Sequence, residues 1–217
     1  MPNERPGPAG GARAKNREAK TRAICEAAVG LFLEQGVRSA TVDAITRAAG
    51  VSKGSFYQYF EDKTQLVEVL FAPLRKTMLT AMARCEKSLQ ATTPKGASHA
   101  SQLNEAYATL AAELGTTLLG QPELSRLYLQ ECRGPKTGAR APIRALSDEL
   151  AKGALDLTRA AHDRGLLKPL APTITALAVV GAVETLLIRH LDGEDLGPIE
   201  AIPASLITMV LDGLRAE

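Results

Sequence analysis

The segment from Thr41 to Phe60 constrains the fold more than any other part of this chain. Thr41 is suited to cap a short helix that Gly50 ends, and Ser52 is suited to cap a second helix. Only Val51 and Ser52 separate Gly50 from that second helical segment. Two short helices joined this tightly predict a helix-turn-helix.

Helices are also expected on both sides of this segment. Apolar residues from about 20 to 35 recur at the spacing of an amphipathic helix, and Gly36 supplies its C-terminal stop. Asp62 is suited to cap a fourth helix, with Gln65 completing a capping-box-like pair. Pro73 removes an internal hydrogen bond, so we expect the fourth helix to kink just before this residue and to resume beyond it.

The rest of the chain predicts helices and loops. Ala and Leu recur at helical spacings, and alternating runs of Val, Ile and Thr are nearly absent. Segments 91–101 and 133–140 are rich in Pro, Gly, Thr and Ser and are predicted to be loops. The predicted fold is therefore all-α with about nine helices, the later ones near 102–119, 122–132, 141–164, 172–190 and 198–215.

Positive charge gathers at the N-terminal end. Residues 1–75 hold eleven Lys and Arg against eight Asp and Glu, whereas the remainder holds fifteen against sixteen. Much of the excess lies before residue 23, after a leader rich in Pro and Gly. Such a cluster either contacts phosphates or forms a solvated, disordered arm.

The second helix of the tight pair has a distinct outward face. On a wheel of 100° per residue, Phe60 lies within about 40° of Phe56, so both aromatic rings are expected to point inward. The opposite face is rich in hydrogen-bond donors and nearly free of negative charge, which suits the major groove of DNA. Its residues are Gly54, Gln58, Ser55 and Tyr57, with Lys53 beside them. The alternative is a merely solvated face.

Each of these residues has a chemistry that suits DNA. Gln58 can pair with an adenine edge, and Gly54 lets the helix backbone approach closely. Ser55 and Tyr57 can contact bases or phosphates. Three further residues could fix phosphates, namely Thr41, Tyr59 and Lys63.

Residues 21–70 resemble the N-terminal domain of the TetR family of bacterial transcription regulators. The resemblance rests on TRAICEAAVGLFLEQG, then TVDAITRAAGVS, then KGSFYQYFEDKTQL, in that order and spacing. Cys25 departs from the larger aliphatic residue usual in the family, and Pro73 departs from its continuous fourth helix. The resemblance implies DNA-contacting positions at Thr41, Ser52, Lys53, Gly54, Ser55, Tyr57, Gln58, Tyr59 and Lys63.

The resemblance also implies an N-terminal three-helix DNA-binding domain followed by a helical ligand-binding and dimerisation domain. We therefore expect a basic flexible arm at 1–19, the helix-turn-helix domain at 20–72 and the C-terminal domain at 73–217. Residues on the apolar helices of that domain are the expected ligand pocket: Tyr107, Leu110, Leu114, Tyr128, Glu131, Cys132, His162 and Glu184.

Apolar stripes on the last two helices predict a dimer interface, although both helices could equally be buried within one subunit. Its expected residues are Leu177, Val180, Leu187, Ile202, Leu206 and Val210. The prediction is a homodimeric repressor that a small-molecule effector releases from a palindromic operator in double-stranded DNA. A ligand-independent DNA-binding regulator of the same fold is the alternative.

An enzyme in a helical bundle is disfavoured. The chain has no paired E-x-x-H motif, no Ser/His/Asp set and no phosphate loop. Glu184 lies six residues from His190, so these two are expected on opposite sides of a helix. The three cysteines are far apart, and no metal site or cofactor is expected. With no apolar stretch long enough to cross a membrane and no export signal, the expected location is the cytoplasm.

Overall fold

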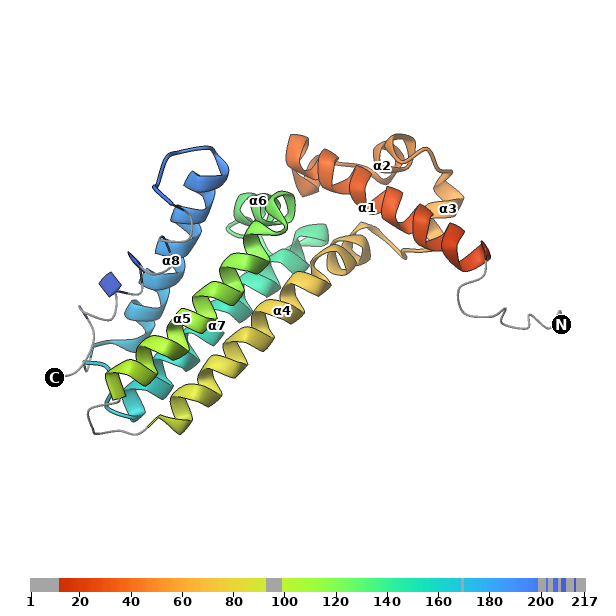
Figure 1. Ribbon diagram of the computed structural model, residues 1–217. Coiled ribbons are helices and arrows are strands. Elements are labelled where there is room, and N and C mark those ends of the chain that lie inside the picture. Colours follow the sequence, from red (N-terminus) through yellow and green to blue (C-terminus); the bar gives the residue numbers. More distant parts are fainter. Residues whose placement is uncertain are drawn as a thin grey trace.

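The computed structural model describes residues 12–92, 99–168 and 170–198, together with 202, 205, 206, 208, 209 and 213. Within these residues the chain is all-α, with eight α-helices and one short 3-10 helix (Figure 1). The ninth helix predicted at 198–215 lies mostly outside the described residues, as does Val210.

Three helices form an N-terminal unit that we call the head: α1 (Ala12–Ser39), α2 (Val42–Ala48) and α3 (Lys53–Tyr57). α1 begins at Ala12, so the part of the expected flexible arm from residue 12 to residue 19 is helical. The apolar stripe of α1 packs against α2 and α3 to make the core of the head. Its fully buried residues include Ile24, Ala28, Phe32, Ile45 and Phe56.

Side-chain caps fix where the short helices begin. Thr41, Ser52 and Asp62 precede α2, α3 and α4, as predicted from the sequence. Each side-chain oxygen accepts a hydrogen bond from the amide three residues later, at 3.1, 3.1 and 2.8 Å respectively. These bonds satisfy amides that a helix start leaves without a partner. The turn between α2 and α3 is thereby defined at both ends.

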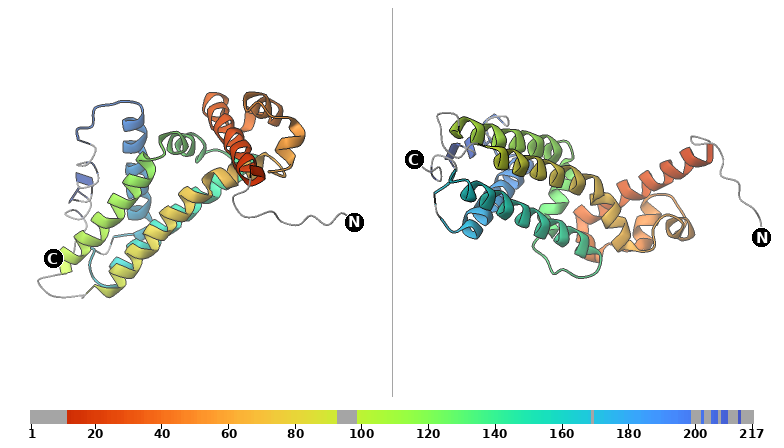
Figure 2. Two further views of the ribbon diagram at one scale, coloured as in Figure 1. Left: turned by 45° about the vertical axis from the view of Figure 1, so that its right-hand side comes forward. Right: turned by 90° about the horizontal axis from the view of Figure 1, so that it is seen from below.

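The remaining helices form the body. α4, α5 and α7 run side by side, and α4 leads from the head into this bundle (Figures 1 and 2). α8 packs on α7, and α6 lies where the body meets α1. The elements are α4 (Lys63–Ala91), α5 (His99–Leu119), α6 (Pro122–Glu131), the 3-10 helix η1 (Gly138–Arg140), α7 (Ala141–Asp163) and α8 (Pro172–Leu191).

α4 contains Pro73 and continues beyond it as a single helix, Lys63–Ala91, so the helix resumes after the proline as predicted. Pro73 lies on the exposed side of the helix, as does Val69, whose carbonyl loses its amide partner. Because that carbonyl belongs to an exposed residue, water can satisfy it. The boundary predicted between residues 72 and 73 therefore falls inside one helix that the head and the body share.

The last turn of α1 is set off by Gly36, whose φ of 80° breaks the regular helix. An L-residue pays steric strain at such a φ, which accounts for a glycine at this position. A Cβ atom here would also lie 3.2 Å from Oε1 of Glu131, on α6. The end of α1 is therefore shaped to meet the body.

Candidate nucleic-acid interface and ligand cavity

α3 presents to solvent the face that the wheel predicted. Phe56 and Phe60 are 0% and 2% exposed, and their ring centroids lie 5.4 Å apart in the core of the head. Gly54 and Gln58 are exposed, and the Tyr57 side chain is 52% exposed. α3 and the turn that follows it therefore bury the rings of Phe56 and Phe60 and leave Gly54, Tyr57 and Gln58 available to a partner.

The hydroxyl groups around this face also hold the backbone. Thr41 and Ser52 are the caps of α2 and α3, and Ser52 Oγ lies 3.0 Å from Ser55 Oγ. Both capping residues are exposed. A hydroxyl that accepts an amide bond keeps its own proton to donate, so Thr41 can cap α2 and still face a phosphate.

Lys53 begins α3 and forms an ion pair with Asp43 of α2, with 2.8 Å between Nζ and Oδ1. The hydrogen bond to Asp43 raises the pKa of Lys53 above its usual range. Both side chains are more than half exposed, so solvent screens the attraction. Lys53 is therefore accessible to an anion that competes with Asp43.

Lys63 has a structural task instead of the expected phosphate contact. Its ammonium donates hydrogen bonds to the carbonyls of Val37, Arg38 and Ala40, at 2.7, 3.1 and 2.6 Å. Burial lowers the pKa of Lys63, while the carboxylate of Glu131 opposes that shift. An ammonium has three donors, and all three are engaged here. Lys63 thus caps the end of α1 and has no donor left for DNA.

The basic start of α1 lies close to the end of α3. The Arg17 guanidinium sits 5.8 Å from the centre of the Tyr59 ring, within the range of a cation–π contact. Lys15 and Arg22 are exposed on the same helix. The first turns of α1 therefore extend the positive charge of the head beside its outward face.

Glu131 joins the head to the body. Its buried carboxylate accepts a hydrogen bond from the Val37 amide at 2.8 Å and a second from the Arg140 guanidinium. Val37 belongs to the end of α1, whereas Glu131 ends α6. A charge-assisted bond of this kind is stronger than one between neutral groups. We call this contact the Glu131 junction.

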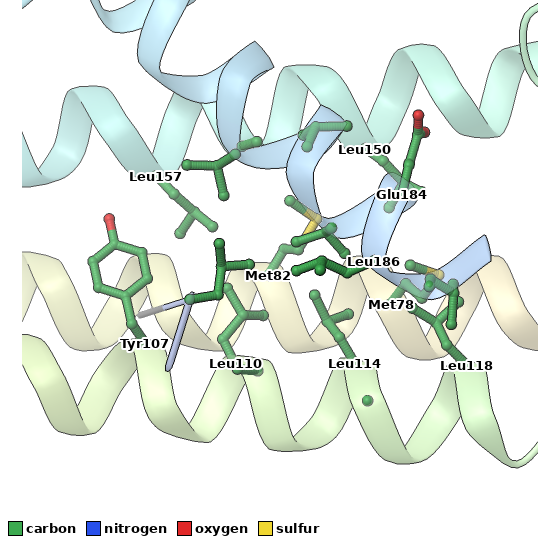
Figure 3. Close-up of a pocket in the computed structure, with 18 of the residues that line it drawn as sticks. Met78, Met82, Tyr107, Leu110, Leu114, Leu118, Leu150, Leu157, Glu184 and Leu186 are labelled. Carbon is green, nitrogen blue, oxygen red and sulfur yellow. The ribbon is translucent and has the colours of Figure 1, made fainter. Parts of the chain in front are cut away.

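An apolar cavity of about 280 Å³ lies between α4, α5, α7 and α8 (Figure 3). Five of the residues expected in a pocket line it: Tyr107, Leu110, Leu114, Tyr128 and Glu184. Three others are not among its lining residues: Glu131 forms the junction, Cys132 is buried and His162 is half-buried at the end of α7. Met78, Met82, Leu150 and Leu157 also line the cavity and were not predicted. Such side chains look like any other core positions in a sequence.

The lining of the cavity carries a small polar cluster near α6. Glu184 accepts hydrogen bonds from the Tyr128 hydroxyl and from the Arg133 guanidinium, each at 3.0 Å. Burial raises the pKa of Tyr128, and the Glu184 carboxylate adds to that shift. His190 lines the same cavity, so the expectation that Glu184 and His190 face opposite sides is wrong.

α8 divides its apolar residues between the cavity and solvent. Val180 and Leu187, expected at a dimer interface, line the cavity, as do Ile202 and Leu206 from the described part of the last segment. Leu177 is 53% exposed, and Ile174 is 71% exposed. The outward apolar face of α8 therefore differs from the predicted one and includes Ile174 and Leu177.

The three cysteines are free thiols with raised pKa values. Burial raises the pKa of Cys25 to about 11 and that of Cys85 to about 12, and it also raises the pKa of Cys132. Thiols of this kind are mostly protonated near neutral pH and react slowly. Among the described residues, no three His, Cys, Asp or Glu side chains are grouped to hold a metal ion.

Comparison with known proteins matches the head to a regulator family. Residues 24–70 match the model of the bacterial regulatory proteins of the tetR family. The HTH-type transcriptional regulator TtgR of Pseudomonas putida is 36% identical over 85 residues, 39% of this chain and 40% of TtgR. The chain spans less than half the length of the first curated relatives that it matches.

Solved structures match the fold over nearly the whole chain. NalD of Pseudomonas aeruginosa, a repressor of the MexAB-OprM multidrug efflux pump, covers 93% of this chain and 98% of its own, with a TM-score of 0.67 and 22% identity. FadR of Bacillus subtilis, solved with stearoyl-CoA, covers 88% and 98%, with a TM-score of 0.63 and 19% identity. At these identities the likeness shows the all-α, two-part fold.

Replacing Lys63 with Met should destabilise the head by about 2 kcal/mol or more, because three carbonyls lose a charged donor. Thermal unfolding followed by circular dichroism measures the effect. Lys53→Met is the matched control, since its ion pair is exposed, and it should leave the melting temperature unchanged. Equal melting temperatures for the two variants would show that Lys63 does not cap α1.

Proposed function

We propose that the whole chain is a dimeric transcription regulator of the TetR family, whose model matches residues 24–70. It reads a palindromic operator in double-stranded DNA and is released when a small molecule enters the body. The outward face of α3 carries the proposal, because an exposed glycine, phenol and amide stand on a helix whose other face is anchored in the core.

In this proposal α3 enters the major groove. Gln58 bonds an adenine edge, Tyr57 contacts a base or phosphate, and Gly54 brings the backbone close. The hydroxyls of Thr41, Ser52 and Ser55, the ammonium of Lys53 and the phenol of Tyr59 contact the flanking backbone. Lys63 leaves this set, because the carbonyls at the end of α1 occupy its donors.

The first turns of α1 add phosphate contacts at the edge of the site. Lys15 and Arg22 are exposed, and the contact between Arg17 and Tyr59 keeps this stretch beside α3. Lysine and arginine that neutralise phosphates release counterions, which raises affinity without reading sequence. A protein that binds the chromosome in this way works in the cytoplasm.

A second copy of the chain covers the outward face of α8. Ile174 and Leu177 are exposed there, and a Cβ on Gly181 would meet no atom within 4 Å, which leaves room for a partner helix. Contrary to the expectation that no apolar stretch is long enough to cross a membrane, α8 is apolar and long enough to do so by length and composition alone, and little of it is buried. Pairing of two such faces buries this apolar surface. It also fixes the separation of the two heads, so that each can bind one half-site of the operator.

The release step needs a physical link between cavity and head, and α6 is placed to supply it. Tyr128 lines the cavity and bonds Glu184 of α8, while Glu131, one turn further along α6, bonds Val37 of α1. A ligand changes DNA affinity only if it binds more tightly to the state with the wrong head position. A molecule that displaces Tyr128 therefore also shifts α6 and with it the Glu131 junction.

Selection of bound duplexes from a random pool tests the DNA-reading function. We expect enrichment of an inverted repeat whose half-sites lie one helical turn, about 34–36 Å, or a multiple of it apart. The double variant Tyr57→Ala and Gln58→Ala should lose this preference, by at least tenfold in affinity, because the base contacts vanish. Its fold should persist, since both side chains are exposed. Enrichment of the same repeat by the variant would refute the proposed reading face.

Substitution of Leu177 by Glu tests the proposed pairing of α8. Because an unpaired charge is costly to bury at an apolar interface, the variant should sediment as a monomer and bind the operator weakly. Val69→Glu is the control, since Val69 is 44% exposed on α4, away from α8, and it should leave the dimer intact. A Leu177→Glu dimer as stable as wild type would place the interface elsewhere.

A further inference from the structure

The cavity in the body extends along α5. Its lining on α5 includes Tyr107 and Leu118, which are eleven positions and therefore about 16 Å apart at the rise of an α-helix. Figure 3 shows Tyr107 at one end of the row, Leu110 and Leu114 along it, and Leu118 at the other end; Glu184 is drawn beside Leu150, across the cavity in the half that holds Leu118. An occupant that fills the row must be extended.

The cavity volume sets the size of that occupant. A dry cavity of about 150 Å³ accommodates benzene, so 280 Å³ has room for roughly ten to twelve carbon atoms. An extended chain advances about 1.2 Å per bond, so ten to twelve carbon atoms span about 11–13 Å, which is most of the 16 Å row. The length of the row and the volume of the cavity are therefore both compatible with one unbranched aliphatic chain.

Two hydroxyl groups of the lining are already bonded within the protein. The Tyr128 hydroxyl bonds Glu184, and the Thr158 hydroxyl bonds the Ala154 carbonyl at 2.8 Å. Among the described residues, no fully buried side-chain nitrogen or oxygen lacks a hydrogen-bond partner. A charged head group drawn into this largely apolar space would lose most of its water, which is costly.

A carboxylate head is especially unsuited to the end near α6. It would lie beside the Glu184 carboxylate, whose cationic partner Arg133 points a largely exposed side chain to solvent. Two negative charges repel each other more strongly in an apolar surrounding than in water. Glu184 thus selects against anions, while its oxygens and the Tyr128 hydroxyl can still exchange hydrogen bonds with a hydroxyl or a carbonyl.

We propose that the effector is a single-chain aliphatic molecule of about ten to twelve carbon atoms with an uncharged head group, such as an alcohol, aldehyde or ester. This inference rests on the proposed ligand-responsive function and names the chemical class that its cavity takes. The chain lies along α5 between Tyr107 and Leu118, and the head lies at Glu184.

Gly115 offers a test of the site. It lines the cavity, and a Cβ at this position would meet no atom within 4 Å. Gly115→Leu should fill the cavity without a clash, and Gly115→Ala is the matched control for helix propensity. With 1-decanol as the probe, wild type and Gly115→Ala should show a raised melting temperature, whereas Gly115→Leu should show none. An equal rise in all three proteins would place the binding site elsewhere.

The shape and charge of the ligand are tested by calorimetric titration of the full chain at pH 8. 1-Decanol should bind at least tenfold more tightly than 1-naphthol, which has the same number of carbons in a flat ring, and at least tenfold more tightly than decanoate. Glu184→Gln should reduce the ratio of the decanol affinity to the decanoate affinity at least threefold. Glu113→Gln is the control, because Glu113 bonds Arg84 outside the cavity. This variant should leave the ratio of the two affinities unchanged.

Equal binding of decanol and 1-naphthol would overturn the single-chain shape. An unchanged ratio of the decanol and decanoate affinities in Glu184→Gln would overturn the role of Glu184, and the absence of decanol binding to wild type would overturn the ligand class. Each outcome is independent of DNA reading, because duplex selection by the ligand-free protein does not involve the cavity. A protein that selects an inverted repeat but binds no aliphatic chain would keep the DNA-reading function and lose this inference.

Discussion

The buried carboxylate of Glu131 is the contact on which the arrangement of head and body depends. It accepts one bond from the Val37 amide at the end of α1 and another from Arg140 at the start of α7. A buried carboxylate without such partners would be strongly destabilising. The glycine at position 36 fits the same contact, because a Cβ there would crowd Glu131. One side chain therefore sets how the end of α1 meets the body.

α6, the short helix that ends at Glu131, also contributes to the wall of the cavity. Tyr128 lies one turn before Glu131, lines the cavity and bonds Glu184 of α8. α4 provides a second path, because it passes unbroken through Pro73 from the head into the cavity wall at Met78 and Met82. The proposed regulation follows from this geometry, since an occupant of the cavity touches both elements that hold the head.

Local sequence signals predicted the head well, and its long-range contacts could not be read. Thr41, Ser52 and Asp62 act within three residues of themselves, so their caps were legible. Lys63 bonds carbonyls more than twenty residues earlier, and Glu131 bonds an amide 94 residues away. No periodicity in the sequence encodes such long-range pairs. For this reason Lys63 was predicted to contact DNA and Glu131 was predicted to line a pocket.

In the body, the sequence predicted the helices but not which face of each helix is buried. The hydrophobicity of α8 was clear, but an all-round apolar helix does not say which side meets a cavity and which meets a partner. Packing against α7 turns Val180 and Leu187 inward and leaves Leu177 outside. Pro73 is tolerated inside α4, where both the proline and Val69, whose carbonyl it frees, lie on the exposed side of the helix.

Amide hydrogen exchange at Val37 tests most directly whether the Glu131 carboxylate holds the head to the body. In the wild-type protein the Val37 amide should be protected as strongly as the amides in the middle of α7. In Glu131→Ala, the amides from residue 37 to residue 40 should exchange at least tenfold faster, while those of α7 keep their protection. Unchanged exchange at Val37 in the variant would contradict the junction, and so would an equal loss of protection in every helix.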